Sequence, residues 1–231
     1  MKTTAAANES GEILVIRKPA HWTSFDVVKK IRNLTRIKKV GHAGTLDPFA
    51  EGVLLICLGR ATKQVDRLMD LPKEYVAEIQ LGKQTDTLDP EGTVVQEAPV
   101  PELNEALLKD VLQQFVGEIE QEIPAYSAAK FQGKRLYKLA RKGKAVPRLF
   151  KTVRIYELEL LDWGKDYLKI RILCSRGTYV RTLARDIANR LGTVGYLRAL
   201  IRTRIGPYRL EDALSIQDVE AQHKRTDAGG S

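Results

Sequence analysis

The sequence predicts a mixed α/β (α+β) domain in which a largely antiparallel central sheet is flanked by helices. Two observations support this fold class. Strand-like stretches, such as 74–81 and 167–174, interleave with stretches of helical period, such as 180–191. The order of these stretches lacks the regular strand–helix–strand rhythm of a parallel sheet, so most strand pairs are expected to be antiparallel.

The first part of the chain is divided by its glycines and prolines. The pattern first predicts a strand over 12–16 that ends at Lys18-Pro19. A helix follows, capped by Thr23 or Ser24, with apolar residues at helical spacing: Phe25, Val28, Ile31 and Leu34. After it the pattern predicts a glycine-bounded loop over 41–52, a strand over 53–59, a helix over 61–71 and a strand over 74–81. The strand over 53–59 is almost continuously apolar, which indicates burial on both faces.

The second part of the chain also alternates between strands and helices. The pattern predicts an acidic turn over 86–92, a helix over 101–115, a helix at the end of 130–142 and a hairpin of strands 152–163 and 167–174. A helix that begins at 176–178 and ends at Gly192, a strand near 199–205 and a short polar helix follow. We expect a flexible terminus over 1–11, one domain over 12–220 and a flexible tail over 221–231.

Composition limits the class of protein. The chain has 231 residues, of which 43% are hydrophobic and 29% charged, enough for a sizeable core and unlike a disordered, collagenous or disulfide-rich chain. The longest apolar run, Val53 to Leu58, has six residues, whereas a membrane-spanning helix needs roughly 20. The polar N-terminus lacks a secretory signal, and Cys57 and Cys174 lie in apolar surroundings. These features predict a cytoplasmic protein with reduced, buried thiols.

Charge is distributed unevenly along the chain. The net charge is +9, but the blocks 17–39, 130–154 and 171–209 together hold 27 basic and 2 acidic residues, and the rest of the chain holds 11 basic and 27 acidic ones. A solvated basic surface is the simpler interpretation of the net charge. The segregation favours the alternative, in which the blocks converge on one face that binds a polyanion such as nucleic acid.

Few residues are candidates for chemistry. The sequence contains no nucleotide-binding glycine loop, no serine elbow, no zinc-protease helix and no cluster of four metal ligands. What remains is Asp47 in GHAGTLDPFAEG. The spacing alone favours an ordinary turn residue, whereas the scarcity of acids among the basic residues favours a chemical role. His42 in the same loop, Tyr75 at a strand start and Arg181 at the edge of an apolar helical stripe also have structural interpretations, although Arg181 can reach inward.

Five segments resemble one known family. GHAGTLDPFAEGVLLICLG is similar to the catalytic-aspartate segment of the TruB-type tRNA pseudouridine synthases. The similarity continues through KEYVAEIQLGKQTDTLDPEG, IPAYSAAKFQGKRLYKLARKG, LCSRGTYVRTLARDIANRLG and LRALIRTRIGPYRLEDAL, in the expected order over roughly residues 12–216. The resemblance implies the pseudouridine synthase catalytic fold and isomerisation of the TΨC-loop uridine, uridine-55 of tRNA, without cofactor or metal.

The same resemblance implies roles for named residues. Asp47 matches the nucleophile, and a cation beside a carboxylate favours the reactive anion, a place that Arg181 matches. Tyr75 matches the tyrosine that stacks on the target base and is a candidate acceptor for its C5 proton. The target uridine must be flipped out of the folded loop, and His42 matches a histidine near the flipped nucleotides.

Other matches concern RNA binding. Lys73, Lys130 and Leu200 match further pocket positions, and the basic segment about 130–151, with Lys134, Arg135 and Lys138, resembles the mobile loop that clamps the T-arm. Many bacterial members continue into a C-terminal PUA domain, which we expect this chain to lack. We expect a monomer that needs no protein partner. Two alternatives stay open: a tRNA-binding or folding module in which catalysis is not essential, and a guide-dependent RNA pseudouridine synthase.

Overall fold

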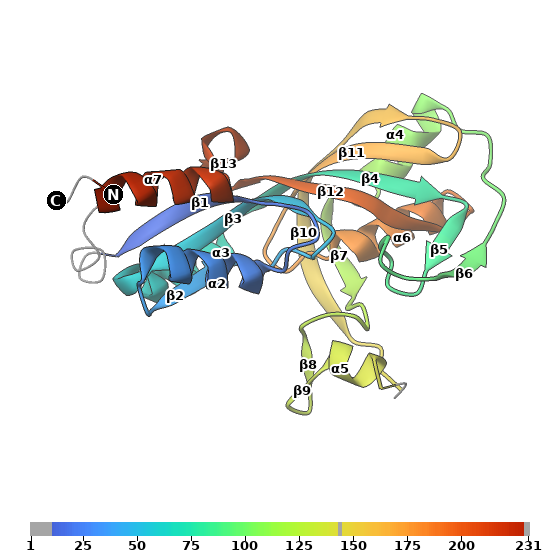
Figure 1. Ribbon diagram of the computed structural model, residues 1–231. Helices are drawn as coiled ribbons and strands as arrows, with labels where there is room; N and C mark the ends of the chain where they lie inside the picture. The colour runs from blue at the N-terminus through green and yellow to red at the C-terminus, as the bar shows by residue number, and fades with distance from the viewer. Residues whose placement is uncertain (1–10, 143–144, 229–231) are drawn as a thin grey trace. The chain divides into compact units, whose positions relative to one another are not determined.

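The structure is a computed structural model that describes residues 11–142 and 145–228 (Figure 1). The described residues fall into two compact units, one of residues 11–75 with 201–228 and the other of residues 76–200. The predicted flexible terminus falls almost entirely on residues 1–10, outside the described residues. The last residues of the predicted tail, 229–231, also lie outside them, as do residues 143–144 of the predicted clamping segment.

The first unit is built on a small sheet. Its strands are β1 (Glu12–Lys18), β2 (Val40–Ala43), β3 (Glu51–Leu58), the end of β12 (Gly195–Ile205) and β13 (Tyr208–Arg209). β1 and β2 pair antiparallel with β3, whereas β12 pairs parallel with it where Ile201 lies opposite Glu51. β2 and β12 both pair with β3, and the chain between β2 and β3 turns back within residues 44–50.

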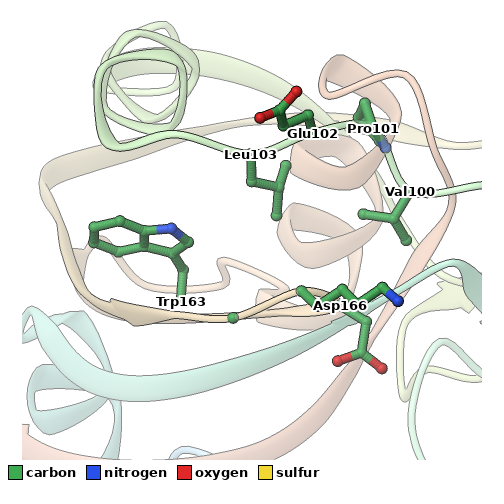
Figure 2. Close-up of a pocket in the computed structure, with 8 residues that line it drawn as sticks. Val100, Pro101, Glu102, Leu103, Trp163 and Asp166 are labelled. Carbon is green, nitrogen blue, oxygen red and sulfur yellow. The ribbon is translucent and has the colours of Figure 1, made fainter.

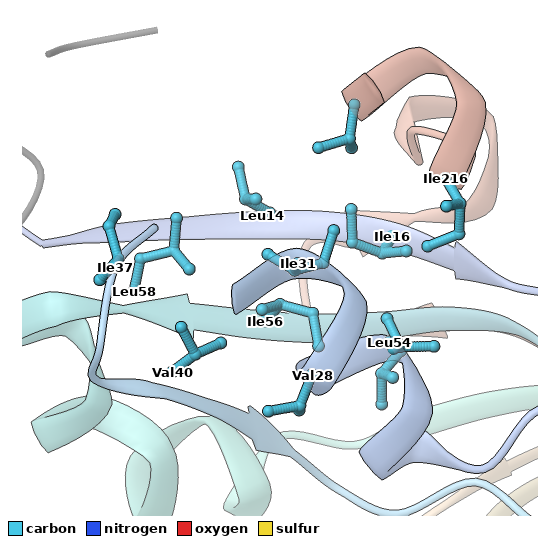
Figure 3. Packing of buried hydrophobic residues seen from close by; sticks show 12 residues of the cluster. Leu14, Ile16, Val28, Ile31, Ile37, Val40, Leu54, Ile56, Leu58 and Ile216 are labelled. Carbon is cyan, nitrogen blue, oxygen red and sulfur yellow. The ribbon is translucent and has the colours of Figure 1, made fainter. Parts of the chain in front are cut away.

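β3 is buried on both faces, as the sequence predicts. Leu54, Ile56 and Leu58 point into a cluster with α2 (Ser24–Thr35) and α7 (Ile216–Ala228), which Figure 3 shows from close by. The alternate residues Val53, Leu55 and Cys57 pack toward a second cluster that contains Leu68 of α3 (Val65–Asp70). A 3-10 helix, η1 (Gly59–Gln64), connects β3 to α3. The continuous apolar run is therefore explained by helices packing on each side of the strand.

α2 begins where the sequence predicts. The side chain of Thr23 accepts from the backbone N–H of Asp26, and the Asp26 carboxylate accepts from the backbone N–H of Thr23, which makes a capping box. The prediction of the apolar face was wrong at one position. Phe25 is 61% exposed, and Val27 is buried in its place.

The second unit contains the larger part of the antiparallel sheet. Its order is the start of β12, then β4 (Lys73–Leu81), β11 (Tyr167–Cys174), β10 (Phe150–Trp163) and β7 (Gly117–Glu122). β10 and β11 form the predicted hairpin, and β7 pairs with the other edge of β10 from Gly117 to Glu122. α4 (Glu105–Gln113) and α6 (Val180–Arg190) pack on this sheet. The predicted mixed, largely antiparallel fold class is confirmed.

Short elements complete the description. They are β5 (Lys83–Thr85) with β6 (Val94–Glu97), β8 (Lys130–Phe131) with β9 (Lys134–Arg135), α5 (Leu136–Ala140) and the 3-10 helix η2 (Leu210–Asp212). Within the described ranges, the structure contains no helix with the length and apolarity needed to cross a membrane.

Several boundaries differ from the prediction, and three of them have a clear cause or consequence. α4 begins at Glu105 instead of residue 101, because the Asn104 side chain accepts from the backbone N–H of Leu107 at 2.9 Å and caps the helix there. The predicted loop over 41–52 begins as strand β2, since its first residues pair with β3. α7 extends to Ala228, into the range for which the sequence predicts a flexible tail; the domain boundaries themselves stay a prediction.

Candidate active site

Asp47 lies in the short connection between β2 and β3. The backbone N–H of Ala50 donates to the carbonyl of Asp47 at 3.2 Å. This bond closes a turn over residues 47–50, so the turn begins at Asp47, two residues later than the predicted Thr-Leu-Asp-Pro turn. Because Ala43 pairs with Leu55 just outside the connection, the sheet of the first unit anchors the turn at both ends.

A buried arginine holds the start of this turn. Arg202 lies on β12 opposite Gly52 and is 1% exposed. Its Nε donates to the carbonyl of Val53 at 2.7 Å, and its two terminal nitrogens donate to the carbonyls of Gly44 at 3.1 Å and Thr45 at 3.4 Å. One guanidinium thus ties the residues before Asp47 to the strand that follows it.

A buried lysine holds the other side of the turn. Lys18 ends β1, is fully buried, and its Nζ donates to the carbonyls of Pro48 at 3.1 Å, Trp22 at 2.6 Å and Pro19 at 2.8 Å. The backbone N–H of His21 also donates to the Pro48 carbonyl at 2.7 Å. The residue after Asp47 is therefore fixed to the segment that leads into α2.

The residue before Asp47 is fixed by α2 itself. The Ser24 hydroxyl donates to the carbonyl of Leu46 at 3.2 Å, and the backbone N–H of Leu46 donates back to that hydroxyl at 3.0 Å. Both neighbours of Asp47 in the chain are thus held through their backbone groups. A catalytic group needs this kind of support, because an error of one ångström in its position can cost two orders of magnitude in rate.

Lys18 and Arg202 were not predicted as site residues. From the sequence, Lys18 is the end of a strand and Arg202 is one member of a basic block expected to face RNA. Lys18 and Arg202 are both buried among protein groups, so the expectation of an RNA-facing surface is wrong for these two residues. A possible signal for Arg202 was its position inside the apolar strand near 199–205, where an exposed arginine would break the pattern.

His42 lies on β2 opposite Ile56, not in a loop as the sequence predicts. Among the described residues its buried Nδ1 has no hydrogen-bond partner. Burial lowers the pKa of His42, and the guanidinium of Arg202 lowers it further by repelling the imidazolium. The imidazole is therefore held in its neutral form beside the Asp47 turn.

Lys73 and Tyr75 lie two residues apart on β4 and share its buried face. The Nζ of Lys73 donates to the carbonyls of Leu71, at 2.6 Å, and Met69. A Cβ placed on Gly44 would lie 3.9 Å from Cε of Lys73 and 3.7 Å from a terminal nitrogen of Arg202, so both cationic side chains border the start of the Asp47 turn. Tyr75 is 8% exposed.

Arg181 belongs to the second unit, where it is the second residue of α6. Its side chain is 5% exposed, and Nη1 lies 3.3 Å from a carboxylate oxygen of Asp89. Nη1 also donates to the carbonyl of Thr87 at 2.8 Å, and Nη2 donates to that of Tyr126 at 2.9 Å. The expectation that Arg181 reaches inward is confirmed.

Asp89 was not predicted as a site residue. It lies in the acidic turn before β6 and is 5% exposed. Its carboxylate accepts from the Thr87 hydroxyl at 2.5 Å and from the backbone N–H of Glu91 at 3.0 Å. A signal was present, since Thr87 to Pro90 repeats the Thr-Leu-Asp-Pro letters of residues 45–48.

The remaining predicted residues also lie in the second unit. Leu200 is buried on β12, at 6% exposure. Lys130, Lys134, Arg135 and Lys138 are exposed on the β8–β9 hairpin and α5, and Lys130 lies opposite Arg135. The structure thus gathers His42, Asp47, Lys73 and Tyr75 in the first unit and places Arg181, Leu200 and the four exposed cations in the second. No group of three or more potential metal ligands occurs in the part of the chain that the structure describes.

Comparison with known proteins gives the family. The model of the TruB family pseudouridylate synthase N-terminal domain matches residues 32–180. The chain belongs to the TruB family of pseudouridylate synthases. A second model, of the tRNA pseudouridylate synthase B C-terminal domain, matches residues 181–229.

Individual relatives agree with the family. A protein of Phocaeicola vulgatus named tRNA pseudouridine synthase B is 47% identical over 90% of this chain and 92% of that protein. One of Francisella philomiragia with the same name is 49% identical over 90% of this chain and 69% of that protein.

Solved structures share the fold over the whole chain. A Cbf5-Nop10-Gar1 complex gives a TM-score of 0.76 at 28% identity, covering 100% of this chain and 60% of that one. An archaeal box H/ACA Nop10-Cbf5 complex gives 0.72 at 25% identity, covering 100% and 59%. The TruB-family chain therefore spans about 60% of the length of these solved chains.

Proposed function

We propose that this TruB-family chain is a tRNA pseudouridine synthase that isomerises the uridine of the TΨC loop, position 55 of tRNA, to pseudouridine. The observation that carries the proposal is Asp47, a carboxylate whose neighbours in the chain are fixed through their backbone by Lys18, Ser24 and Arg202. The names of the relatives in Phocaeicola vulgatus and Francisella philomiragia support the choice of tRNA as substrate.

The reaction rearranges one nucleotide without a donor group. The bond between C1′ of the ribose and N1 of uracil breaks, the base turns, and a bond forms between C1′ and C5. The hydrogen on C5 leaves as a proton and N1 gains one, so atoms and electrons balance without a cofactor. Asp47 is the nucleophile in this proposal, and whether it attacks C1′ or C6 of the base does not change the balance.

Other residues take supporting roles. Tyr75 stacks on the flipped base, and the resemblance to the family gives Arg181 the role of cationic partner of the nucleophile. Neutral His42, beside the Asp47 turn, occupies space near the flipped nucleotides, and the same resemblance gives Lys73 and Leu200 the role of pocket residues. Lys130, Lys134, Arg135 and Lys138 contact the T-arm phosphates. We place the protein in the cytoplasm as a monomer that needs no protein partner.

The experiment that tests the function maps pseudouridine in tRNA. Bulk tRNA lacking pseudouridine is incubated with the purified chain and analysed by mass spectrometry. We expect conversion at the TΨC-loop uridine without any guide RNA. Absence of pseudouridine at that position would contradict the proposal, and conversion only with an added guide would support the guide-dependent alternative. Equal rescue of tRNA maturation by wild type and Asp47→Asn would support the folding-module alternative.

A further inference from the structure

Lys151 occupies an unusual position near the start of β10. It is half-buried, it lies opposite Gln121 of β7, and its Nζ donates to the carbonyl of Gly177. The ammonium also lies 4.2 Å from the centroid of the Tyr179 ring, within the range of a cation–π interaction. A Cβ on Gly177 would lie 2.8 Å from this Nζ, so a side chain at that position would displace the end of the lysine.

The ionised side chain that acts on Lys151 is that of Arg176, which precedes Gly177 in the same segment. Arg154 lies three residues further along β10 and therefore on the other face of the strand. The acidic residues on the adjacent strand β7 are Glu118, Glu120 and Glu122, and Glu122 is in ion pairs with Arg148 and Arg185. Burial first, and repulsion from Arg176 second, lower the pKa of Lys151 to about 8. A bound anion would stabilise this charge.

The cluster is also held rigidly next to a residue of the candidate active site. Gln121 is fully buried; its side-chain oxygen accepts from the backbone N–H of Tyr179 at 2.8 Å, and its amide donates to the Tyr179 carbonyl at 3.1 Å. Tyr179 is followed two residues later by Arg181. Lys151 is therefore fixed, through the Tyr179 ring, to the segment that carries Arg181.

We propose that Lys151 and Arg176, positioned by Tyr179, bind one backbone phosphate of the substrate RNA. The proposal rests on the function proposed above, because it takes the polyanion to be tRNA. The Lys151 ammonium and the planar Arg176 guanidinium both suit a phosphate, the guanidinium through paired N–H groups. The Tyr179 ring holds the ammonium in place, and Gly177 leaves room for it.

A pH dependence of RNA binding follows. Phosphate favours the charged lysine, so the bound protein holds the Lys151 proton to a higher pH than the unbound protein does. Above a pH of about 8, where unbound Lys151 loses its proton, binding must take up a proton and the affinity falls as pH rises. Below about pH 7 the lysine is already charged, and this contribution to the affinity no longer changes with pH.

The test measures the Kd of a T-arm stem-loop from pH 7 to 9 at fixed salt for wild type, Lys151→Arg, Lys151→Met and Lys169→Met. Lys169 is a matched control, an exposed lysine on β11 of the same sheet. We expect the wild-type and control Kd to rise several-fold between pH 7 and 9. Lys151→Arg should keep the wild-type Kd at pH 7 within about twofold and lose the pH dependence, because guanidinium stays charged.

Lys151→Met should bind several-fold more weakly at pH 7, without the pH dependence, and its slope of log K against log salt should fall by about 0.7–0.9, the value of one phosphate contact. A Lys151→Met protein with the wild-type Kd, salt slope and pH profile would overturn the proposal. If Lys151→Met binds as wild type does and still isomerises saturating RNA, the proposed phosphate site is wrong and the proposed function stands. If wild type isomerises no RNA but the Lys151 effects appear, the function is wrong and the RNA site stands.

Discussion

The chain contains the same four residues, Thr-Leu-Asp-Pro, at 45–48 in the first unit and at 87–90 in the second. In both places the aspartate begins a turn, closed by the backbone N–H of Ala50 on the Asp47 carbonyl and by that of Gly92 on the Asp89 carbonyl, yet the turns are held in different ways. The first is fixed through its backbone, by buried cations and the Ser24 hydroxyl. The second is fixed through its carboxylate, because Asp89 accepts hydrogen bonds within its own turn and pairs with Arg181.

A local motif therefore does not specify the role of its aspartate. The letters encode a turn in both places, as proline restrains the residue before it. The role depends on groups that the fold brings from elsewhere: Arg202 and Lys18 for one turn, Arg181 for the other. We therefore assign chemistry to Asp47 and a supporting role to Asp89, and the following changes test that division.

The largest effect on stability should come from Asp89. Asp89→Asn removes the carboxylate that faces a guanidinium with 5% exposure, and breaking a buried ion pair costs about 3–5 kcal/mol. Chemical denaturation should show the free energy of unfolding falling by about 3 kcal/mol. In a double-mutant cycle with Arg181→Met the losses should not add, and additive losses would show that the two residues are not coupled.

The next effect should come from Arg202. Arg202→Met leaves three carbonyls without their donor, so we expect a loss of about 2–3 kcal/mol of stability and a lower kcat with little change in KM. Added guanidinium should restore part of the kcat of Arg202→Ala, because that truncation leaves room for the ion beside the same three carbonyls. The matched control is Arg17→Gln, which removes an exposed ion pair with Glu51 and should cost less than about 0.5 kcal/mol.

A variant that keeps the wild-type kcat without the Arg202 guanidinium would show that the backbone of the Asp47 turn needs no such support. Equal losses of unfolding free energy in Arg202→Met and Arg17→Gln would show that the buried guanidinium contributes no more to stability than the exposed one.

The smallest effect concerns His42. Its pKa is lowered in the folded protein, so the unfolded chain binds a proton more readily and folding stability falls as pH drops through the ordinary histidine range. His42→Gln should reduce this acid sensitivity, and Arg202→Met should raise the pKa of His42 toward its ordinary value. NMR titration of the imidazole measures both; an unchanged pKa in Arg202→Met would remove Arg202 as a cause.

The fold was largely predictable where the pattern is local. The limits of β11 match the predicted strand 167–174, since one face of that strand is regularly buried. In contrast, the sequence did not predict β7, which reads GEIEQE, because three glutamates are not typical of a strand. The strand forms because its backbone pairs with β10. The candidate site was also predictable only in part. Asp47 and Arg181 were predicted from the resemblance to the family. The burial of Lys18 and Arg202 was not predictable, because it depends on carbonyls that are distant in sequence.

The most direct test of the central claim, that Asp47 performs chemistry while Asp89 supports the structure, is single-turnover tritium release from C5-labelled T-arm RNA by Asp47→Asn. We expect no release above the protein-free rate. The unfolding free energy should stay within about 1 kcal/mol of wild type and the Kd within a few-fold, because Lys18, Ser24 and Arg202 still hold the backbone on both sides of residue 47. Measurable turnover by Asp47→Asn would contradict the assignment of Asp47 as the nucleophile.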